Sequence, residues 1–172
     1  RRLVRENSEL RQAVSSPRPR TRYIGRSAAT SEMLRNIEKI ARLDSNVLIT
    51  GESGVGKGLV ARMIHYAGPR SEGPFIVVNC TALPRDLVES ELFGHEKGAF
   101  TGAAAKRMGR VQMAEKGTLF LDEIGDMPLE AQPKLLTFLQ DRCYLPVGAS
   151  REITSNVRVI AATNHDLKTM CA

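Results

Sequence analysis

The sequence predicts an α/β fold, a parallel sheet flanked by helices on both faces. Four short apolar runs have the length of buried strands, at residues 46–50, 75–79, 118–122 and 157–163. Between them lie segments in which apolar residues recur at helical spacing. Buried strands that alternate with helices are typical of a sheet whose strands run parallel and are covered on both sides.

The helices between these strands are predicted from their own apolar positions. The first runs from Thr30 or Ser31, either of which can cap it, to about Ala41. One side of this helix is apolar and is formed by Met33, Leu34, Ile37 and Ile40. Further helices are predicted at 59–66, 83–93 and 128–140. Pro133 lies either near the first turns of the last helix or at a kink within it.

The first 22 residues are predicted to form a separate segment. Residues 3–14 can form a short helix with a coiled-coil seam at Leu3, Asn7, Leu10 and Val14. The seam is shorter than the roughly three or four heptads that a coiled-coil assignment requires. Residues 15–20 contain two prolines that break any helix. We therefore divide the chain into an N-terminal helix with a basic linker, 1–22, and one domain, 23–172.

The net charge of +6 belongs to the N-terminal part of the chain. Residues 1–26 hold eight arginines against two glutamates, whereas residues 27–172 hold 17 basic and 17 acidic side chains. A DNA-binding domain usually has a basic face of its own, so this balance argues against direct DNA binding by the domain. No apolar run approaches the roughly 18–20 residues that cross a bilayer. We therefore expect a cytoplasmic protein without a membrane segment.

Neither the cysteines nor the N-terminus suggests secretion. The cysteines are Cys80, Cys143 and Cys171, an odd number without CxxC spacing, so we expect reduced thiols rather than a zinc site or disulfides. No apolar stretch follows the arginine-rich N-terminus, so no signal peptide is predicted. The first residue is Arg1 rather than methionine, which indicates a piece of a longer protein.

A glycine-rich turn that fits G-x-x-x-x-G-K follows the first strand and precedes a helix. Its glycines let the backbone wrap around an anion, and the helix N-terminus adds positive potential. Lys57 supplies a point charge for the outer phosphates of a nucleotide. The predicted nucleotide-binding residues of the turn are Gly51, Glu52, Ser53, Gly54, Val55, Gly56, Lys57 and Gly58. Gly58 replaces the usual Ser or Thr ligand of magnesium, so the metal must depend on other ligands and water.

Two carboxylates, Asp122 and Glu123, end the third strand at the edge where open parallel sheets bind ligands. Asp122 can hold Mg²⁺, and Glu123 can act as the general base that polarises the attacking water. Asn79 and Asn164 end two other strands and would point into the same crevice, although isolated residues of this kind are more often turn formers. The candidate catalytic residues are therefore Glu123, Asp122, Asn79 and Asn164, with ATP and Mg²⁺ as the expected ligands.

Beyond these motifs, six residues are identical to the GAFTGA loop of the sigma-54-dependent activators, also called bacterial enhancer-binding proteins. They are Gly98, Ala99, Phe100, Thr101, Gly102 and Ala103. The stretches 79–84, 89–97 and 117–126 are similar to the same family. The resemblance covers about residues 24–168, and the loop together with both nucleotide motifs is a very specific combination.

The resemblance implies an AAA+ ATPase with a P-loop NTPase core that assembles into a ring, commonly a hexamer. In this family the GAFTGA loop contacts sigma-54 in the RNA polymerase holoenzyme and moves with the nucleotide state. Gly98 and Gly102 would supply hinge freedom, and Phe100 would supply an exposed apolar tip.

Other roles follow from matching positions. The resemblance implies that Asn79 holds Glu123 until the γ-phosphate is sensed. It implies that the first sensor is formed by Thr163 and Asn164, and that the adenine is contacted by Ile24 and Gly25. The chain departs from the family at Gly58, where relatives usually have glutamate, and at Pro146, where many have arginine.

Family members continue beyond Ala172 with arginine fingers, a helical lid with a second sensor and usually a helix-turn-helix domain. Because arginine fingers typically contribute about 10³–10⁵ in rate, we expect weak nucleotide binding and very slow hydrolysis from this chain alone. Contact with DNA is expected only through a domain absent from it. The N-terminal helix resembles the linker from a regulatory domain, such as the phosphorylation receiver of a two-component system.

Two other functions compete with that of an ATPase acting on the polymerase. One is a nucleotide-binding fragment that displays the sigma-54 loop without enzymatic activity. The other is a different AAA+ machine, such as a clamp loader or helicase, which the intact GAFTGA loop argues against.

Overall fold

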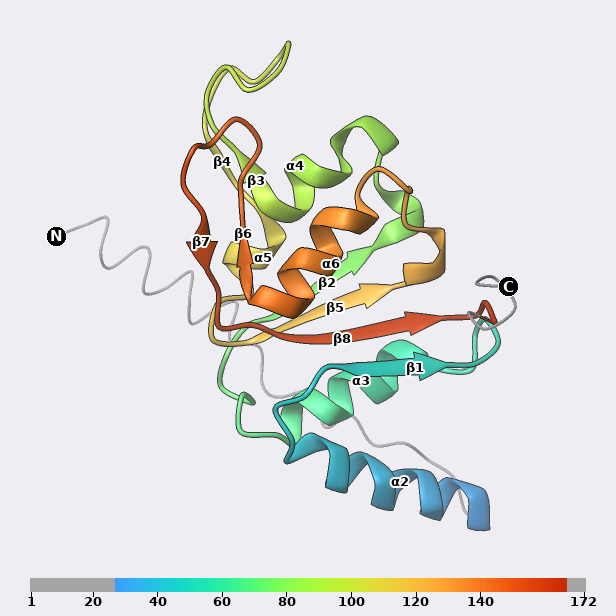
Figure 1. The fold of residues 1–172 in the computed structure, drawn as a ribbon. Helices are drawn as coiled ribbons and strands as arrows, with labels where there is room; N and C mark the ends of the chain where they lie inside the picture. The colour runs from blue at the N-terminus through green and yellow to red at the C-terminus, as the bar shows by residue number, and fades with distance from the viewer. Residues whose placement is uncertain (1–26, 167–172) are drawn as a thin grey trace, which may run out of the picture.

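The computed structural model describes residues 27–166, so the predicted N-terminal helix, the linker and the residues Ile24 and Gly25 lie outside the described range. Its centre is a four-stranded sheet (Figure 1). The strands are β1 (Val47–Thr50), β2 (Phe75–Asn79), β5 (Thr118–Asp122) and β8 (Arg158–Thr163). They lie in the order β1-β8-β5-β2, and every neighbouring pair is parallel. All four predicted strands are confirmed.

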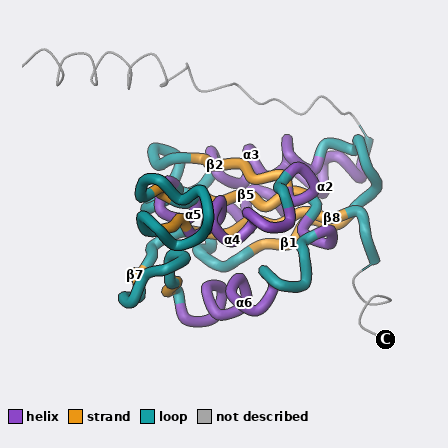
Figure 2. The backbone as a smooth tube through the Cα atoms, turned by 90° about the horizontal axis from the view of Figure 1, so that it is seen from above, coloured by secondary structure: helices purple, strands orange, loops and turns teal. Residues whose placement is uncertain are grey.

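Helices cover both faces of the sheet, as predicted, and Figure 2 shows α3 (Lys57–Tyr66) and α6 (Gln132–Asp141) on opposite sides of it. One core packs against α2 (Ala28–Ala41) and α3 (Lys57–Tyr66). The other packs against α4 (Val88–Phe93), α5 (Arg110–Met113) and α6 (Gln132–Asp141). Adjacent residues of β5 point to opposite faces, so Phe120 enters the first core while Leu119 and Leu121 enter the second. No helix of the described range is long and apolar enough to cross a membrane.

Helix α2 begins earlier than predicted. Its N-cap is Ser27 rather than Thr30 or Ser31, and the Ser27 hydroxyl accepts a hydrogen bond from the backbone N–H of Thr30 at 3.1 Å. Ala28 and Ala29 are strong helix formers, so the first turn extends back to the serine that precedes them.

Prolines set the starts of the two helices that differ most from the prediction. Pro84 is extended, with ψ 129°, so the predicted helix at 83–93 is replaced by the 3₁₀ turn η2 (Arg85–Leu87) followed by α4. Pro133 lies in the first turn of α6, which begins at Gln132 rather than at 128. Proline has no N–H, and the first turn of a helix needs none, so Pro133 starts this helix instead of kinking it.

Two hairpins and α5 were not predicted. Strand β3 (Gly94–His95) pairs antiparallel with β4 (Arg107–Met108), and β6 (Cys143–Tyr144) pairs antiparallel with β7 (Ile153–Thr154). Strands of two residues contain no periodicity that a sequence pattern could reveal. A parallel bridge between His95 and Val147 joins the two hairpins, which lie side by side in Figure 1.

The neck of the β3–β4 hairpin is built from two glycines. Gly94 has φ 82°, in the left-handed region. A Cβ atom at Gly109 would lie 2.3 Å from the Gly94 nitrogen and 2.5 Å from the Leu92 carbonyl oxygen, closer than real contacts allow. The two backbone arms therefore touch, and no side chain fits between them.

Two buried polar side chains tie α2 and α3 to the sheet. Arg158 donates to the carbonyl oxygens of Ile40 at 2.8 Å and Ala41 at 3.2 Å, so a cation satisfies the C-terminal end of α2. His65 of α3 lies with its Nδ1 2.9 Å from the Thr118 hydroxyl. Burial, together with the charge of Arg158, lowers the pKa of His65 to about 4, so this ring is neutral at pH 7.

Candidate functional site

The predicted phosphate loop forms the turn between β1 and α3. Gly54 has φ 82° and Gly56 has φ 94°, and only glycine adopts such angles without strain. No atom lies within 4 Å of a Cβ built at Gly54, so the backbone angle rather than a lack of space requires glycine there. Gly56 is the N-cap of α3, and the backbone N–H groups of the first helical turn are therefore available to an anion.

Lys57 is the buried cation of this loop, with only 6% of its side chain exposed. Its Nζ donates to the carbonyl oxygens of Gly51 at 3.0 Å and Glu52 at 3.1 Å, which fixes the ammonium group beside the turn. The same Nζ lies 3.1 Å from Oε1 of Glu123. The structure thus brings together the lysine and the glutamate that the sequence placed in separate motifs.

Glu123 follows the last residue of β5 in a left-handed conformation, with φ 51° and ψ 54°. Such a conformation is costly for a residue other than glycine and is often found at functional sites. Its Oε1 is paired with Lys57, and its Oε2 accepts a hydrogen bond from the backbone N–H of Asn164 at 3.0 Å. Both carboxylate oxygens are therefore held at the C-terminal edge of the sheet, next to the phosphate loop.

Asn79 is held by contacts that the sequence did not predict. It is the register partner of Asp122 on the neighbouring strand. Its Oδ1 accepts hydrogen bonds from the backbone N–H of Thr81 at 3.0 Å and from the Thr81 hydroxyl at 2.6 Å. In this structure Asn79 caps the 3₁₀ turn η1 (Cys80–Ala82), while the carboxylate oxygens of Glu123 contact Lys57 and the N–H of Asn164.

A second contact at the sheet edge joins η3 (Ile124–Asp126) to the end of β8. The Thr163 hydroxyl accepts from the backbone N–H of His165 at 3.1 Å, and His165 Nε2 lies 3.0 Å from Oδ1 of Asp126. A Cβ atom at Gly125 would lie 2.8 Å from the Thr163 hydroxyl, so glycine permits this approach. Sequence reasoning did not select His165 or Asp126, although a histidine just after the predicted sensor was a signal.

The residues at this edge fit a nucleotide and its metal. Asp122 offers one carboxylate, and Mg²⁺ usually binds to one or two carboxylates together with phosphate oxygens and water. No group of three or more His, Cys, Asp or Glu side chains within the described residues could hold a metal ion by itself.

Burial and then the charges of Asp122, Asp126 and Glu123 raise the pKa of Cys80 to about 12, so this thiol is inert at pH 7.

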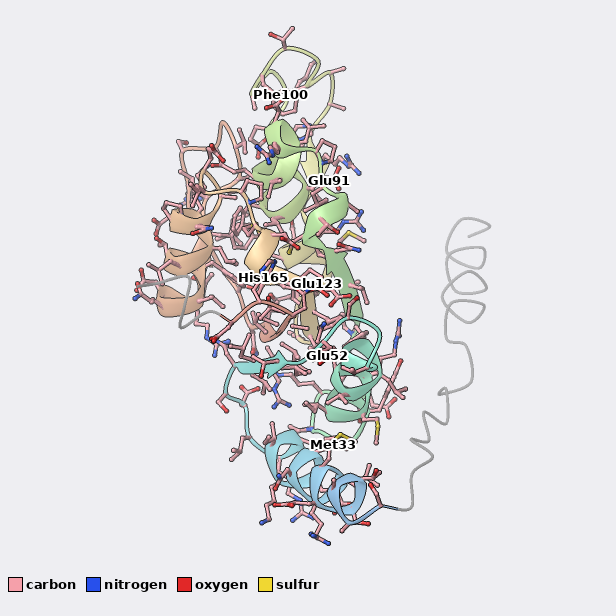
Figure 3. All side chains as sticks on the ribbon, turned by 90° about the vertical axis from the view of Figure 1, so that its right-hand side faces the viewer. Met33, Glu52, Glu91, Phe100, Glu123 and His165 are labelled. Carbon is pink, nitrogen blue, oxygen red and sulfur yellow. The ribbon has the colours of Figure 1, made fainter. Side chains whose placement is uncertain are left out.

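The GAFTGA residues form the loop between β3 and β4, at the end of the molecule remote from Glu52 of the phosphate loop (Figure 3). Gly98 has φ 80° and Gly102 has φ 101°, and the Gly98 N–H donates to the Ala103 carbonyl at 2.8 Å. The Phe100 side chain is 36% exposed and its ring packs edge-to-face on His95, with centroids 5.0 Å apart. The expected apolar tip is thus partly exposed and rests against the base of its own loop.

Comparison with known proteins identifies the family to which the chain is similar. The family described as Sigma-54 interaction domain matches residues 23–172. The chain is 57% identical to the DNA-binding transcriptional regulator NtrC of Rhizobium meliloti over 145 residues, which are 84% of this chain and 30% of that protein. It is 50% identical to the formate hydrogenlyase transcriptional activator FhlA of Escherichia coli over 172 residues, which are 99% of this chain and 25% of that protein. The chain therefore spans about a third or less of the length of these relatives.

Solved structures support the same fold. NtrX from Brucella abortus in complex with ATP matches with a TM-score of 0.82 and 37% identity, over 96% of this chain and 35% of that one. The P-loop NTPase domain of the Sigma-54 transport activator from Escherichia coli matches with a TM-score of 0.55 at 22% identity, over 86% and 83% of the two chains, which bears on the fold alone. These likenesses confirm the predicted AAA+ P-loop NTPase core. Because the family match covers residues 23–172, the chain belongs to the sigma-54-dependent activators and carries their Sigma-54 interaction domain.

Proposed function

We propose that this chain is the ATP-hydrolysing part of an activator of RNA polymerase holoenzyme carrying sigma-54. In this proposal, hydrolysis drives the loop at residues 98–103 to remodel sigma-54 and so permits promoter opening. The observation that carries the proposal is the contact of Lys57 with Glu123 beside a glycine turn, in a chain that also has the intact GAFTGA loop. The family match over residues 23–172 supports a domain boundary after residue 22.

ATP would bind with its phosphates in the turn of residues 51–58. The backbone N–H groups of that turn and the ammonium group of Lys57 supply the positive charge that phosphate oxygens need. Mg²⁺, held by Asp122 together with phosphate oxygens and water, would neutralise part of the phosphate charge. The hydroxyl that usually assists is absent at Gly58, so Asp122 is the predicted protein ligand.

Glu123 would orient and deprotonate the water that attacks the γ-phosphate. In the structure its two carboxylate oxygens contact Lys57 and the Asn164 N–H, so phosphate binding to Lys57 competes directly with Glu123. A glutamate released from the lysine regains the free oxygen that a base requires. Thr163, Asn164 and Asn79 lie at the same edge of the sheet and are proposed to report the γ-phosphate to Glu123.

The working assembly is proposed to be a homo-oligomeric ring, commonly a hexamer in this family. DNA would be contacted through another part of a longer protein, because residues 27–172 carry equal numbers of acidic and basic side chains. Since arginine fingers typically contribute about 10³–10⁵ in rate, the chain by itself should bind nucleotide weakly and hydrolyse it very slowly. A turnover of about 1 per second from the chain alone would contradict this.

The first test is calorimetric binding of magnesium-ATP to the wild-type chain and to Lys57→Ala. Loss of charge-assisted hydrogen bonds should weaken binding by about 10- to 100-fold. Lys39→Ala removes an equal charge from the exposed surface of α2 and should bind like the wild type. Equal affinity for ATP in both variants would refute the phosphate site.

The second test concerns the loop. Thr101→Ala in the full-length protein should abolish activation of the sigma-54 polymerase while ATP hydrolysis persists. Undiminished activation by this variant would refute the role of the loop in contacting sigma-54.

A further inference from the structure

We propose that His95 is the positioning residue of the GAFTGA loop, and that its imidazole ring sets the geometry in which the loop and Phe100 are held. This inference rests on the proposed function of that loop. His95 is the second residue of β3, at the point where the chain leaves the folded layer, and it is only 8% exposed.

Both ring nitrogens of His95 are engaged, and together they join three segments. Nε2 lies 3.0 Å from the carbonyl oxygen of Ala105, on the returning arm of the loop. A carbonyl only accepts, so Nε2 carries the hydrogen of this bond. Nδ1 forms a hydrogen bond with the hydroxyl of Ser90, 2.6 Å away on α4, and the Ser90 side chain is itself buried. The outgoing arm, the returning arm and the helix are thus linked through one side chain.

The same ring also positions Phe100. The two rings meet edge-to-face at 69°, with centroids 5.0 Å apart, an arrangement that aromatic pairs favour. Phe100 lines two hollows of about 440 and 380 Å³, of which the first is also lined by His95 and the second by Val147. Phe100 thus borders open space, and its packing against the His95 ring helps to hold it in place.

Two ion pairs at the base of the loop lie nearer to solvent. Glu96 pairs with Lys106 at 2.6 Å, and Glu91 pairs with Arg107 at 2.5 Å, but the side chains of Lys106 and Arg107 are 69% and 60% exposed. Such exposed pairs contribute little and are screened by salt. The hydrogen bond of His95 with Ser90 is buried and the one with Ala105 is partly buried, so breaking either leaves a shielded polar group without a partner and costs more.

Three variants distinguish a histidine that only fills space from one that positions the loop by its hydrogen bonds. His95→Gln keeps an N–H that can reach the Ala105 carbonyl, whereas His95→Asn keeps a polar atom near Ser90 and loses the bond to Ala105. Both variants remove the ring and part of its volume. Ser90→Ala removes one oxygen atom from α4 and leaves the ring itself intact.

The experiment measures amide hydrogen exchange in the complete 172-residue chain. The amides of Gly98, Ala103 and Ala104 are hydrogen-bonded within the loop, so their exchange reports its opening. We expect His95→Asn to accelerate their exchange on the order of 10-fold and Ser90→Ala to accelerate it less. His95→Gln keeps the bond to Ala105 but loses the ring and the bond to Ser90, so it should accelerate exchange less than His95→Asn does, and the amides of β5 and β8 should not change in any variant.

Equal acceleration in His95→Gln and His95→Asn would overturn the proposal, because volume rather than hydrogen bonding would then hold the loop. Unchanged exchange in both His95→Asn and Ser90→Ala would also overturn it. If His95→Asn fails to fold, Ser90→Ala decides: faster exchange of the loop amides supports the proposal, and unchanged exchange overturns it. Binding of purified sigma-54 is measured in the same variants and should weaken about 10-fold in His95→Asn and less in His95→Gln. If the wild type binds no sigma-54, the proposed function fails, and the exchange data still decide the role of His95.

Discussion

Gly58→Ala is expected to stabilise the chain, although Gly58 lies in the phosphate loop. Gly58 is the second residue of α3, and its φ lies outside the left-handed range. A Cβ atom there would find its nearest neighbour, Cε1 of Phe120, at 3.7 Å, an ordinary van der Waals contact. Alanine in a helix is favoured over glycine by about 0.5–1 kcal/mol, chiefly because the unfolded chain has less conformational freedom. For a chain of this size the gain corresponds to an increase of about 1–4 °C in Tm.

Thermal unfolding followed by circular dichroism measures this change, and calorimetry measures ATP affinity in the same variant. ATP affinity should not fall, because alanine retains the backbone N–H at position 58. Gly56→Ala is the matched control: at φ 94° an added Cβ is strained, so this variant should lose about 1–2 kcal/mol of stability. A lower Tm in Gly58→Ala, or the same change of Tm in both variants, would show that backbone φ and free space do not decide the effect of an added Cβ at these glycines.

Two further predictions concern charge. Glu123→Gln should raise ATP affinity about 10-fold, because Lys57 loses the carboxylate that competes with phosphate, and it should abolish ATP hydrolysis. Calorimetry measures the affinity, and phosphate release measures hydrolysis. Weaker ATP binding by this variant would contradict the competition between Glu123 and phosphate for Lys57. Folding stability should fall by about 2–3 kcal/mol between pH 7 and pH 4.5 on account of His65. Its pKa of about 4 lies below the unfolded value of 6.5, so in this window the unfolded chain binds a proton that the folded chain does not. Urea unfolding at both pH values measures the loss of stability. His65→Asn can keep the contact with Thr118 but does not titrate, so it should lose less stability over this pH range. An equal loss in the wild type and in His65→Asn would show that His65 is not the cause.

The sequence predicted the parts of the fold whose signal lies in long, regular patterns. The four strands are continuous apolar runs, and a parallel sheet buried on both faces requires such runs. The phosphate loop was predicted because its glycines are needed for backbone angles that other residues avoid, as the positive φ angles of Gly54 and Gly56 confirm.

The parts that were not predicted depend on contacts between distant segments. The hairpin strands are two residues long and are specified by pairing and by the close approach of Gly109 to Gly94, not by periodicity. The left-handed conformation of Glu123 and its contact with Lys57, 66 residues earlier, are properties of the folded sheet edge. The start of α2 at Ser27 was missed because several residues within a stretch of five can cap a helix, and sequence patterns locate the ends of helices poorly.

The glycine neck also bears on how this insertion can change during evolution. Because the backbone of Gly109 touches that of Gly94, the chain leaves and re-enters the domain at one fixed point. Residues between 95 and 108 can therefore be lengthened, shortened or exchanged for those of another protein without altering the spacing of the sheet. A side chain at position 109, in contrast, would force the two arms apart. The domain thus carries the segment that we propose to contact sigma-54 as an exchangeable module, and a graft of that segment should succeed only if both glycines are transferred with it.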